Sequence, residues 1–267
     1  MSDIHLDNWL KRVDIDFYIM FIQTWIPFNA WYNKNFYDDN NNLKSDRELI
    51  DYIKRNDNPY KNRIKNLILG NTTESIEFKN CIKKIHEELE LHSLPSEEKR
   101  IKLSSINLYS NPKKDETIEF NKKIYKFEYL HHQPRNTKRF KCTILKNNVS
   151  QVTVGLIDIF KCNNVELEQH EYFQNQNIRV REIIKKGFNE INPQKAINII
   201  SQNNKGIKIA VDLFFIDNIE LITQVIIELI YQLRCKIFHG ELNPNQNYSV
   251  IYENAYNIQK QLVKSLN

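Results

Sequence analysis

The sequence predicts a mainly α-helical fold, a helical bundle with a small β element inserted in the middle of the chain. Glycine and proline are scarce, 5 and 7 among 267 residues, whereas all-β proteins use more of both in their turns. Apolar residues recur at helical spacing near both ends of the chain. Strand-like alternation is clear only within residues 122–146. We therefore expect one domain over residues 1–267, with an insertion at 93–165 that contains a β-hairpin.

Residues 5–37 are expected to form one or two helices. Aromatic side chains recur every three or four positions, on one helical face, as in a packed core. Pro27 should kink the helix or restart it near Ile26, because proline removes a helical hydrogen bond. The aromatic residues of this face are Phe17, Phe21, Trp25, Phe28 and Tyr32.

The next segments also show helical patterns. Ser45-Asp46-Arg47-Glu48 fits a capping box, in which serine and glutamate satisfy each other's backbone amides. The helical pattern that begins there continues through Leu69. Further helices are expected at 75–91, 175–188 and 193–200, while 149–160 is ambiguous between strand and helix.

The predicted hairpin is strongly basic. Residues 122–146 hold eight Lys or Arg residues and one acid, Glu128, with aromatic residues between them. Cations that contact phosphates and rings that stack on bases are typical of single-strand binding. The hairpin is therefore a candidate RNA-binding arm, and the alternative is an ordinary solvated hairpin with its rings packed inward. The RNA-binding candidates are Lys122, Lys123, Lys126, Arg135, Lys138, Arg139 and Lys141.

A long helix is expected over roughly 218–239, ending at Gly240, before a turn at 243–245 and a last helix at 248–266. Polar residues recur every four positions along it. Arg234 lies off this stripe, in an apolar sector. A guanidinium keeps its charge at neutral pH, so on a packed face it requires a carboxylate or a phosphate.

His239 follows Arg234 by five residues, in the last turn of the same helix. Histidine is the usual acid–base group near neutral pH. An arginine and a histidine suffice for metal-independent RNA cleavage, in which the ribose 2′-OH attacks the adjacent phosphorus. The products would be a 2′,3′-cyclic phosphate and a 5′-OH end. Two copies of the chain across a twofold axis would supply both a base and an acid. The alternative is a capping histidine and an ion-paired arginine.

Composition and spacing argue against several other classes of protein. The four cysteines are far apart, so neither a disulfide framework nor a zinc site is expected, and His131-His132 has no further ligand at metal-binding spacing. No signal peptide is visible, and the most apolar stretch, 211–238, contains six charged residues. We expect a cytoplasmic protein with no cofactor, no metal and no membrane partner.

The motif and its surroundings resemble the HEPN superfamily. Leu233–Glu241, closing a long helix before a turn and a last helix, is similar to the R-x4-6-H motif of that family. The segment Phe21–Asn33 is similar to the first helix of one bacterial group, so the likeness covers about the first 35 and last 55 residues. HEPN domains are small helical bundles that usually dimerise and place two motifs in one cleft. Many are ribonucleases of toxin–antitoxin, anti-phage or CRISPR systems.

The resemblance implies that Arg234 and His239 are the catalytic pair and that RNA is the substrate. It also implies a homodimer with a composite active site, and an antitoxin or another defence-system protein as a partner. Four more residues are candidates for support of the site. Asn29 and Asn33 share a helix face and could bind ribose, orient His239 or cap the irregularity at Pro27. The other two are departures from the family pattern, Cys235 after the arginine and Glu241 two positions after the histidine.

Three functions stay open at this point. The first is a HEPN-type endoribonuclease that acts as a toxin or an anti-phage defence effector. The second is a non-catalytic HEPN-fold module that binds RNA or protein, or assembles a complex. The third is an unrelated helical regulator.

Overall fold

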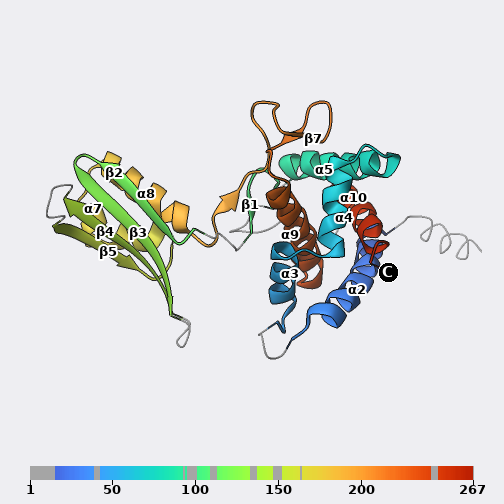
Figure 1. Ribbon diagram of the computed structural model, residues 1–267, viewed down its shortest axis with the longest axis horizontal. Helices are drawn as coiled ribbons and strands as arrows, with labels where there is room; N and C mark the ends of the chain where they lie inside the picture. Colours follow the sequence, from blue (N-terminus) through green and yellow to red (C-terminus); the bar gives the residue numbers. More distant parts are fainter. Residues whose placement is uncertain are drawn as a thin grey trace, which may run out of the picture. The chain divides into compact units, whose positions relative to one another are not determined.

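The computed structural model describes residues 16–38, 43–92, 94, 101–108, 113–132, 137–146, 152–162, 164–241 and 246–266. The chain divides into two compact units, one formed by Met1–Ile106 with Ile197–Asn267 and the other by Asn107–Ala196 (Figure 1). Helices hold 55% and strands 21% of the described residues. The fold is therefore mixed α/β, and the expectation of a mainly α-helical bundle is wrong.

A four-stranded antiparallel sheet in the second unit supplies most of the strand residues. Its strands follow one another in the order β2-β3-β4-β5, so the expected hairpin forms the two central strands. β2 was not predicted because half of its sequence, DETIEF, is charged and its alternating pattern is short. β5 comes from the segment whose apolar run fitted either a strand or a helix. The strands are β2 (Asp115–Phe120), β3 (Lys123–His132), β4 (Thr137–Lys146) and β5 (Thr153–Ile159).

One face of this sheet is covered by α8 (Ile178–Ile191), which packs against β2, β3 and β4 (Figure 1). Gly187 allows the close approach, since a Cβ at this position would lie 2.1 Å from the Phe127 ring. The shorter helices α6 (Asn164–Gln169) and α7 (Glu171–Gln174) precede α8. The buried core of the second unit lies between α8 and the sheet.

The first unit is built from helices near both ends of the chain. α10 packs against α2 and α5, while α9 packs against α3 and α4. The aromatic face expected on the first helix is confirmed, since its side chains from Phe21 to Tyr32 are buried. The helices are α2 (Phe17–Phe36), α3 (Asp46–Arg55), α4 (Pro59–Leu69), α5 (Thr73–Leu91), α9 (Ile219–Phe238) and α10 (Gln246–Val263). Short strand pairs complete the fold: β1 (Ile106–Asn107) with β6 (Ala196–Ile197), and β7 (Ile207–Lys208) with β8 (Phe214–Phe215).

Several local expectations need correction. α2 continues through Pro27, so no restart occurs near Ile26; the buried rings of Trp25 and Phe28 hold both sides of the proline in place. The pattern from Ser45 to Leu69 forms two helices, because Asn58 caps a new helix with Pro59 at its first position.

The helix expected at 193–200 is also wrong. This segment contains strand β6. The Ile199 amide donates to the Leu103 carbonyl, and the Ile199 carbonyl accepts from the Ile216 amide. These partners are distant in sequence, so local periodicity could not reveal them. The capping box and the left-handed Gly240 at the end of α9 are confirmed. The expected turn at 243–245 lies outside the described residues. No described helix has both the length and the apolarity needed to cross a membrane.

Candidate functional site

A buried group of charged side chains fixes α3 against α9. Glu228 on α9 is fully buried, and its carboxylate accepts hydrogen bonds from Lys54 Nζ at 2.6 Å and from both Nη atoms of Arg47 at 2.7 and 2.8 Å. Burial would raise the pKa of Glu228, but the hydrogen bond from Arg47 and the charges of Lys54 and Arg47 hold it below its usual range. On the polar stripe predicted for α9, Glu228 therefore faces cations of α3, whereas Glu220 pairs with Lys61 and Lys65 of α4.

Asp46, in the first turn of α3, joins two segments that the sequence singled out. Its Oδ2 lies 2.9 Å from Nη2 of Arg234. Its Oδ1 accepts a hydrogen bond from the Tyr32 hydroxyl at 2.9 Å and one from the Asn29 amide at 3.3 Å. Burial raises the pKa of Tyr32, so its hydroxyl stays protonated and remains a donor. One carboxylate thus connects α2 and the motif helix α9.

Arg234 is mostly enclosed, with 15% of its side chain exposed. Its guanidinium carbon lies 4.1 Å from the centre of the Phe238 ring and 5.5 Å from the Trp25 ring. Its Nε is buried and has no hydrogen-bond partner among the described residues. The need for an anionic partner, inferred from the sequence, is met by the carboxylate of Asp46.

His239 is placed differently. It is the C-terminal cap of α9, with 60% of its side chain exposed, and Nδ1 lies 4.0 Å from Oε1 of Glu241. Backbone bonds from Gly240 to Ile237 and from Glu241 to Lys236 close the helix in the Schellman pattern, for which Gly240 supplies the left-handed conformation. This turn brings Glu241 back beside Lys236 and His239, so the imidazole stands at an open helix end.

The remaining candidates have local partners. Asn29 binds Tyr32 and Asp46, and the Asn33 amide donates to the Asn29 carbonyl at 2.9 Å. Neither is recorded in contact with His239, so Asn29 acts on the Arg234 side of the site. Cys235 is partly buried beside Tyr231. The pKa of Tyr231 is raised mainly by burial and, to a smaller extent, by this cysteine.

Asp46 was missed as a site residue. The sequence reveals it only as the second residue of a capping box, where an acid is commonplace because it complements the helix dipole. Its contact with Arg234 depends on how α3 packs on α9, which is a tertiary arrangement.

The basic candidates of the hairpin are spread over two faces of the sheet. Alternation puts Lys126, Arg139 and Lys141 on the face away from α8, and Lys123 and Lys138 on the other. Lys122 lies in the tight turn before β3 with a φ of 57°. Arg135 lies outside the described residues.

Carboxylates of neighbouring strands accompany these cations. Arg139 forms an ion pair with Asp158 at 2.6 Å. Lys141 stands between Glu128 on β3 and Asp158 on β5 in the strand register. The edge strand β2 adds three more acids, Asp115, Glu116 and Glu119. The positive charge of the hairpin in sequence is therefore partly balanced within the sheet.

The aromatic residues of the hairpin mostly face α8. Tyr125, Phe127 and Phe140 are buried in the core of the second unit, and Tyr129 stacks on Phe140 with ring centres 4.9 Å apart. Buried rings are not open to stacking by bases. The hairpin therefore still offers exposed cations for the predicted RNA binding, but most of its aromatic rings are not accessible to bases.

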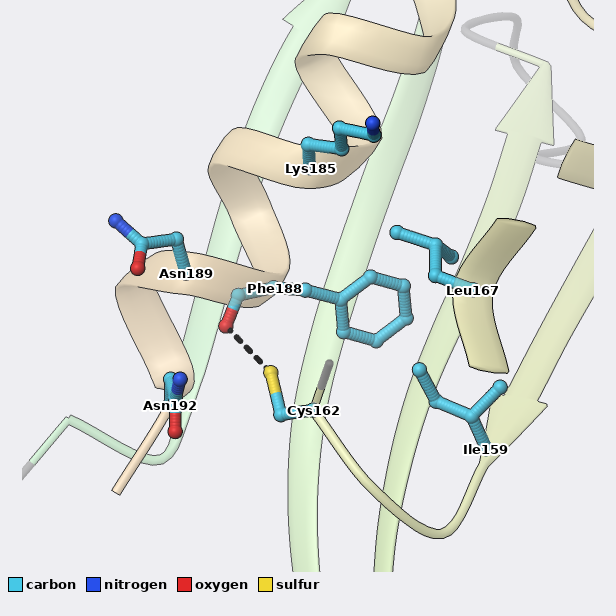
Figure 2. A pocket seen from close by; sticks show the side chains of 7 residues that line it. All are labelled: Ile159, Cys162, Leu167, Lys185, Phe188, Asn189 and Asn192. Atoms are coloured by element: carbon cyan, nitrogen blue, oxygen red, sulfur yellow. Dashed lines mark hydrogen bonds between the residues drawn. The ribbon is translucent and has the colours of Figure 1, made fainter. Parts of the chain in front are cut away.

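The second unit also contains a hollow of about 330 Å³ between β5, α6 and the C-terminal half of α8. Figure 2 shows the Phe188 ring pointing toward Ile159 and Leu167 at its apolar side. The Cys162 thiol donates to the Phe188 carbonyl at 3.2 Å, and burial raises its pKa to about 12. This cysteine is therefore a protonated thiol at neutral pH and no nucleophile.

In the part of the chain that the structure describes, no group of three or more His, Cys, Asp or Glu side chains is arranged to hold a metal ion. Comparisons with protein-family models, with curated proteins and with solved structures find no match to this chain.

Proposed function

We propose that this protein is a metal-independent endoribonuclease that acts as a toxin or anti-phage defence effector. The observation that carries the proposal is the arrangement around α9. Asp46 ties Arg234 to Asn29 and Tyr32, and His239 stands exposed five residues further on. The two sequence segments that resemble HEPN domains thus meet through one carboxylate.

In the proposed reaction, His239 takes the proton of a ribose 2′-OH while the 2′ oxygen bonds to the adjacent phosphorus. The bond from phosphorus to the 5′ oxygen breaks, and an acid protonates the leaving oxygen. The products are a 2′,3′-cyclic phosphate and a 5′-OH end, and no oxidant or metal is consumed. Glu241, 4.0 Å from Nδ1 of His239, is suited to orient the imidazole and leave Nε2 toward the substrate.

Arg234 has a more restricted part in this proposal. Asp46 and two aromatic rings hold its guanidinium, so its charge is fixed in position before any substrate arrives. A fixed cation stabilises the phosphorane without reorganisation during the reaction. The second proton transfer requires another acid, which His239 of a second copy supplies in a twofold dimer. Phe238, one of the two rings that flank the guanidinium, and Ile26, which follows the other in the sequence, are exposed apolar side chains, and they favour such an interface.

The chemistry is tested with an RNA substrate and the same RNA carrying 2′-deoxyribose at the cleavage position, both in EDTA. We expect cleavage of the RNA alone, with cyclic phosphate and 5′-OH ends identified by end-group analysis. Cleavage of the deoxy substrate, or loss of activity in EDTA, would exclude attack by the 2′-OH without a metal.

The second candidate function is a non-catalytic module that binds RNA or protein. The enclosure of Arg234 favours it, because an arginine already paired with Asp46 resembles a structural ion pair. A well-folded protein that binds RNA but leaves it intact across several substrates would favour this candidate.

A further inference from the structure

A hollow of about 490 Å³ lies beside the first turns of α5 in the first unit. One wall belongs to α5, and the other to residues 208–211, the end of β7 and the segment after it. In Figure 1 the segment around β7 lies over α5. Lys83 on α5 holds this segment through Asp212, with Nζ and Oδ1 2.7 Å apart. The volume lies in the range of small-molecule sites, about 300–1,000 Å³.

Three lysines converge on this hollow. Lys79 and Lys83 are four residues apart on one face of α5, and Lys208 enters from β7. No carboxylate occurs among the described residues that line it. Lys83 has two acids nearby, Asp212 at 2.7 Å and Glu87 at 3.5 Å, both of them largely exposed. The lining is therefore positive overall.

Lys79 is unusual among the buried lysines. The structure describes four of them, and Lys54, Lys61 and Lys236 each form an ion pair with a glutamate. Lys79 is 8% exposed, and the only acceptor recorded for it in the described part of the chain is the Gly70 carbonyl, at 2.7 Å. Burial lowers its pKa.

The contact with Gly70 has a structural use, because it satisfies a carbonyl at the C-terminal end of α4. It engages one of the three N–H groups of the ammonium. A buried cation without a carboxylate is costly, so an anion that reaches it in the hollow gains strongly. The two asparagines of the lining, Asn71 and Asn80, add amide donors, and Ile76 and Val211 expose apolar surface.

We propose that this hollow binds a phosphate-bearing small molecule with a flat aromatic ring, of the class of the mononucleotides. The phosphate contacts Lys79 and Lys208 and shares Lys83 with Asp212, since lysine is a common phosphate ligand. The ring lies on Ile76 and Val211. This site is separate from the group around Asp46, and its existence does not depend on RNA cleavage.

Calorimetric titration of the full chain with ADP tests this proposal. The Lys208→Met variant removes an exposed lysine and leaves the fold intact, and Lys79→Met removes the buried one. Lys264→Met, an exposed lysine at the end of α10, is the matched control. We expect ADP to bind, Lys208→Met and Lys79→Met to weaken binding by about tenfold or more, and Lys264→Met to bind as wild type does. Adenosine, which lacks the phosphate, should bind at least about tenfold more weakly than ADP.

The same titrations also give the results that would contradict the proposal. No binding of ADP, or equal affinity in Lys208→Met and Lys264→Met, would overturn the site. Inorganic phosphate binding as tightly as ADP would overturn the ligand class, because the ring would then add nothing. A 5′-phosphorylated RNA oligonucleotide that binds more tightly than ADP, and whose affinity falls on removal of its 5′-phosphate and in Lys208→Met, would show that the phosphate belongs to an RNA end rather than to a free nucleotide. RNA cleavage is measured separately, so its absence leaves these titrations interpretable.

Discussion

The middle of helix α9 and its C-terminal end hold their charged residues in opposite ways. Along the middle, Glu228 is fully buried between Arg47 and Lys54, and Arg234 is held by Asp46. At the end, His239 is 60% exposed, with Glu241 4.0 Å away. The arginine and histidine of one short motif thus differ in environment. The difference indicates that the arginine is fixed by the fold, whereas the histidine is open to solvent.

The largest expected effect is on the buried middle of the helix. Glu228→Gln leaves the cations Arg47 and Lys54 to share the carboxylate of Asp51, so one buried positive charge loses its counter-charge. We therefore expect it to lower the free energy of unfolding by about 3–5 kcal/mol. Glu220→Gln is the matched control, a half-exposed glutamate on the same stripe that also pairs with two lysines, Lys61 and Lys65. It should cost less than about 1 kcal/mol. Urea denaturation measures the unfolding free energy of both variants. Equal losses would show that the burial of Glu228 adds nothing to the cost of removing its charge.

The pH dependence of the same pair sharpens this prediction. The folded pKa of Glu228 lies below the ordinary value of 4.5 because of Arg47 and Lys54. The stability that its charge contributes is therefore complete above about pH 4.5 and is lost as the pH falls through the folded value. The gap in unfolding free energy between wild type and Glu228→Gln should narrow in acid. A gap that is constant from pH 7 to pH 3 would contradict the charged state of Glu228.

An intermediate effect is expected at Asp46. Asp46→Asn keeps the shape of the side chain but removes the charge opposite Arg234, so we expect a loss of about 1–3 kcal/mol in unfolding free energy. RNA cleavage should also fall, because the guanidinium is no longer held. Asp57→Asn, which affects an exposed acid 3.3 Å from Lys65, is the control and should change neither quantity noticeably. Full RNA cleavage activity in Asp46→Asn would show that Asp46 does not contribute to the proposed active site.

A smaller effect is expected at Phe238. Its half-exposed ring lies 4.1 Å from the guanidinium of Arg234, and Phe238→Ala should lower the unfolding free energy by about 0.5–1 kcal/mol through the lost cation–π contact. Leu91→Ala, an exposed apolar residue without such a contact, should stay within about 0.5 kcal/mol. Thermal denaturation at matched concentrations compares the two, and the absence of a difference would mean that the ring does not stabilise the cation.

The sequence predicted the elements of the first unit that depend on local signals. The capping box at Ser45–Glu48, the aromatic face of α2, the polar stripe of α9 and the end of that helix at Gly240 are all read from short-range patterns. The need of Arg234 for an anion also followed from the sequence, because it depends only on helical geometry and on the permanent charge of a guanidinium.

Contacts between different helices and strands could not be predicted from such short-range patterns. Asp46 was invisible as a partner of Arg234, because the contact depends on how two helices pack. The charged strand β2 resembled a loop, and its acids beside the basic hairpin became evident only in the sheet register. Lys79 looked like any helical lysine until its burial without a carboxylate was seen. Asp46 and Arg234 lie far apart in the sequence, and the burial of Lys79 depends on packing that no local pattern shows.

Whether His239 moves the proton is tested most directly by comparing RNA cleavage by His239→Ala and His92→Ala in EDTA. Both residues are histidines at the C-terminal cap of a helix, with 60% and 41% of their side chains exposed, and each lies about 4 Å from a glutamate. Neither substitution should change unfolding free energy by more than about 0.5 kcal/mol. We expect His239→Ala to reduce the cleavage rate by about 10²–10⁴-fold and His92→Ala to retain the wild-type rate. Equal rates in the two variants would contradict the assignment of His239 as the group that moves the proton.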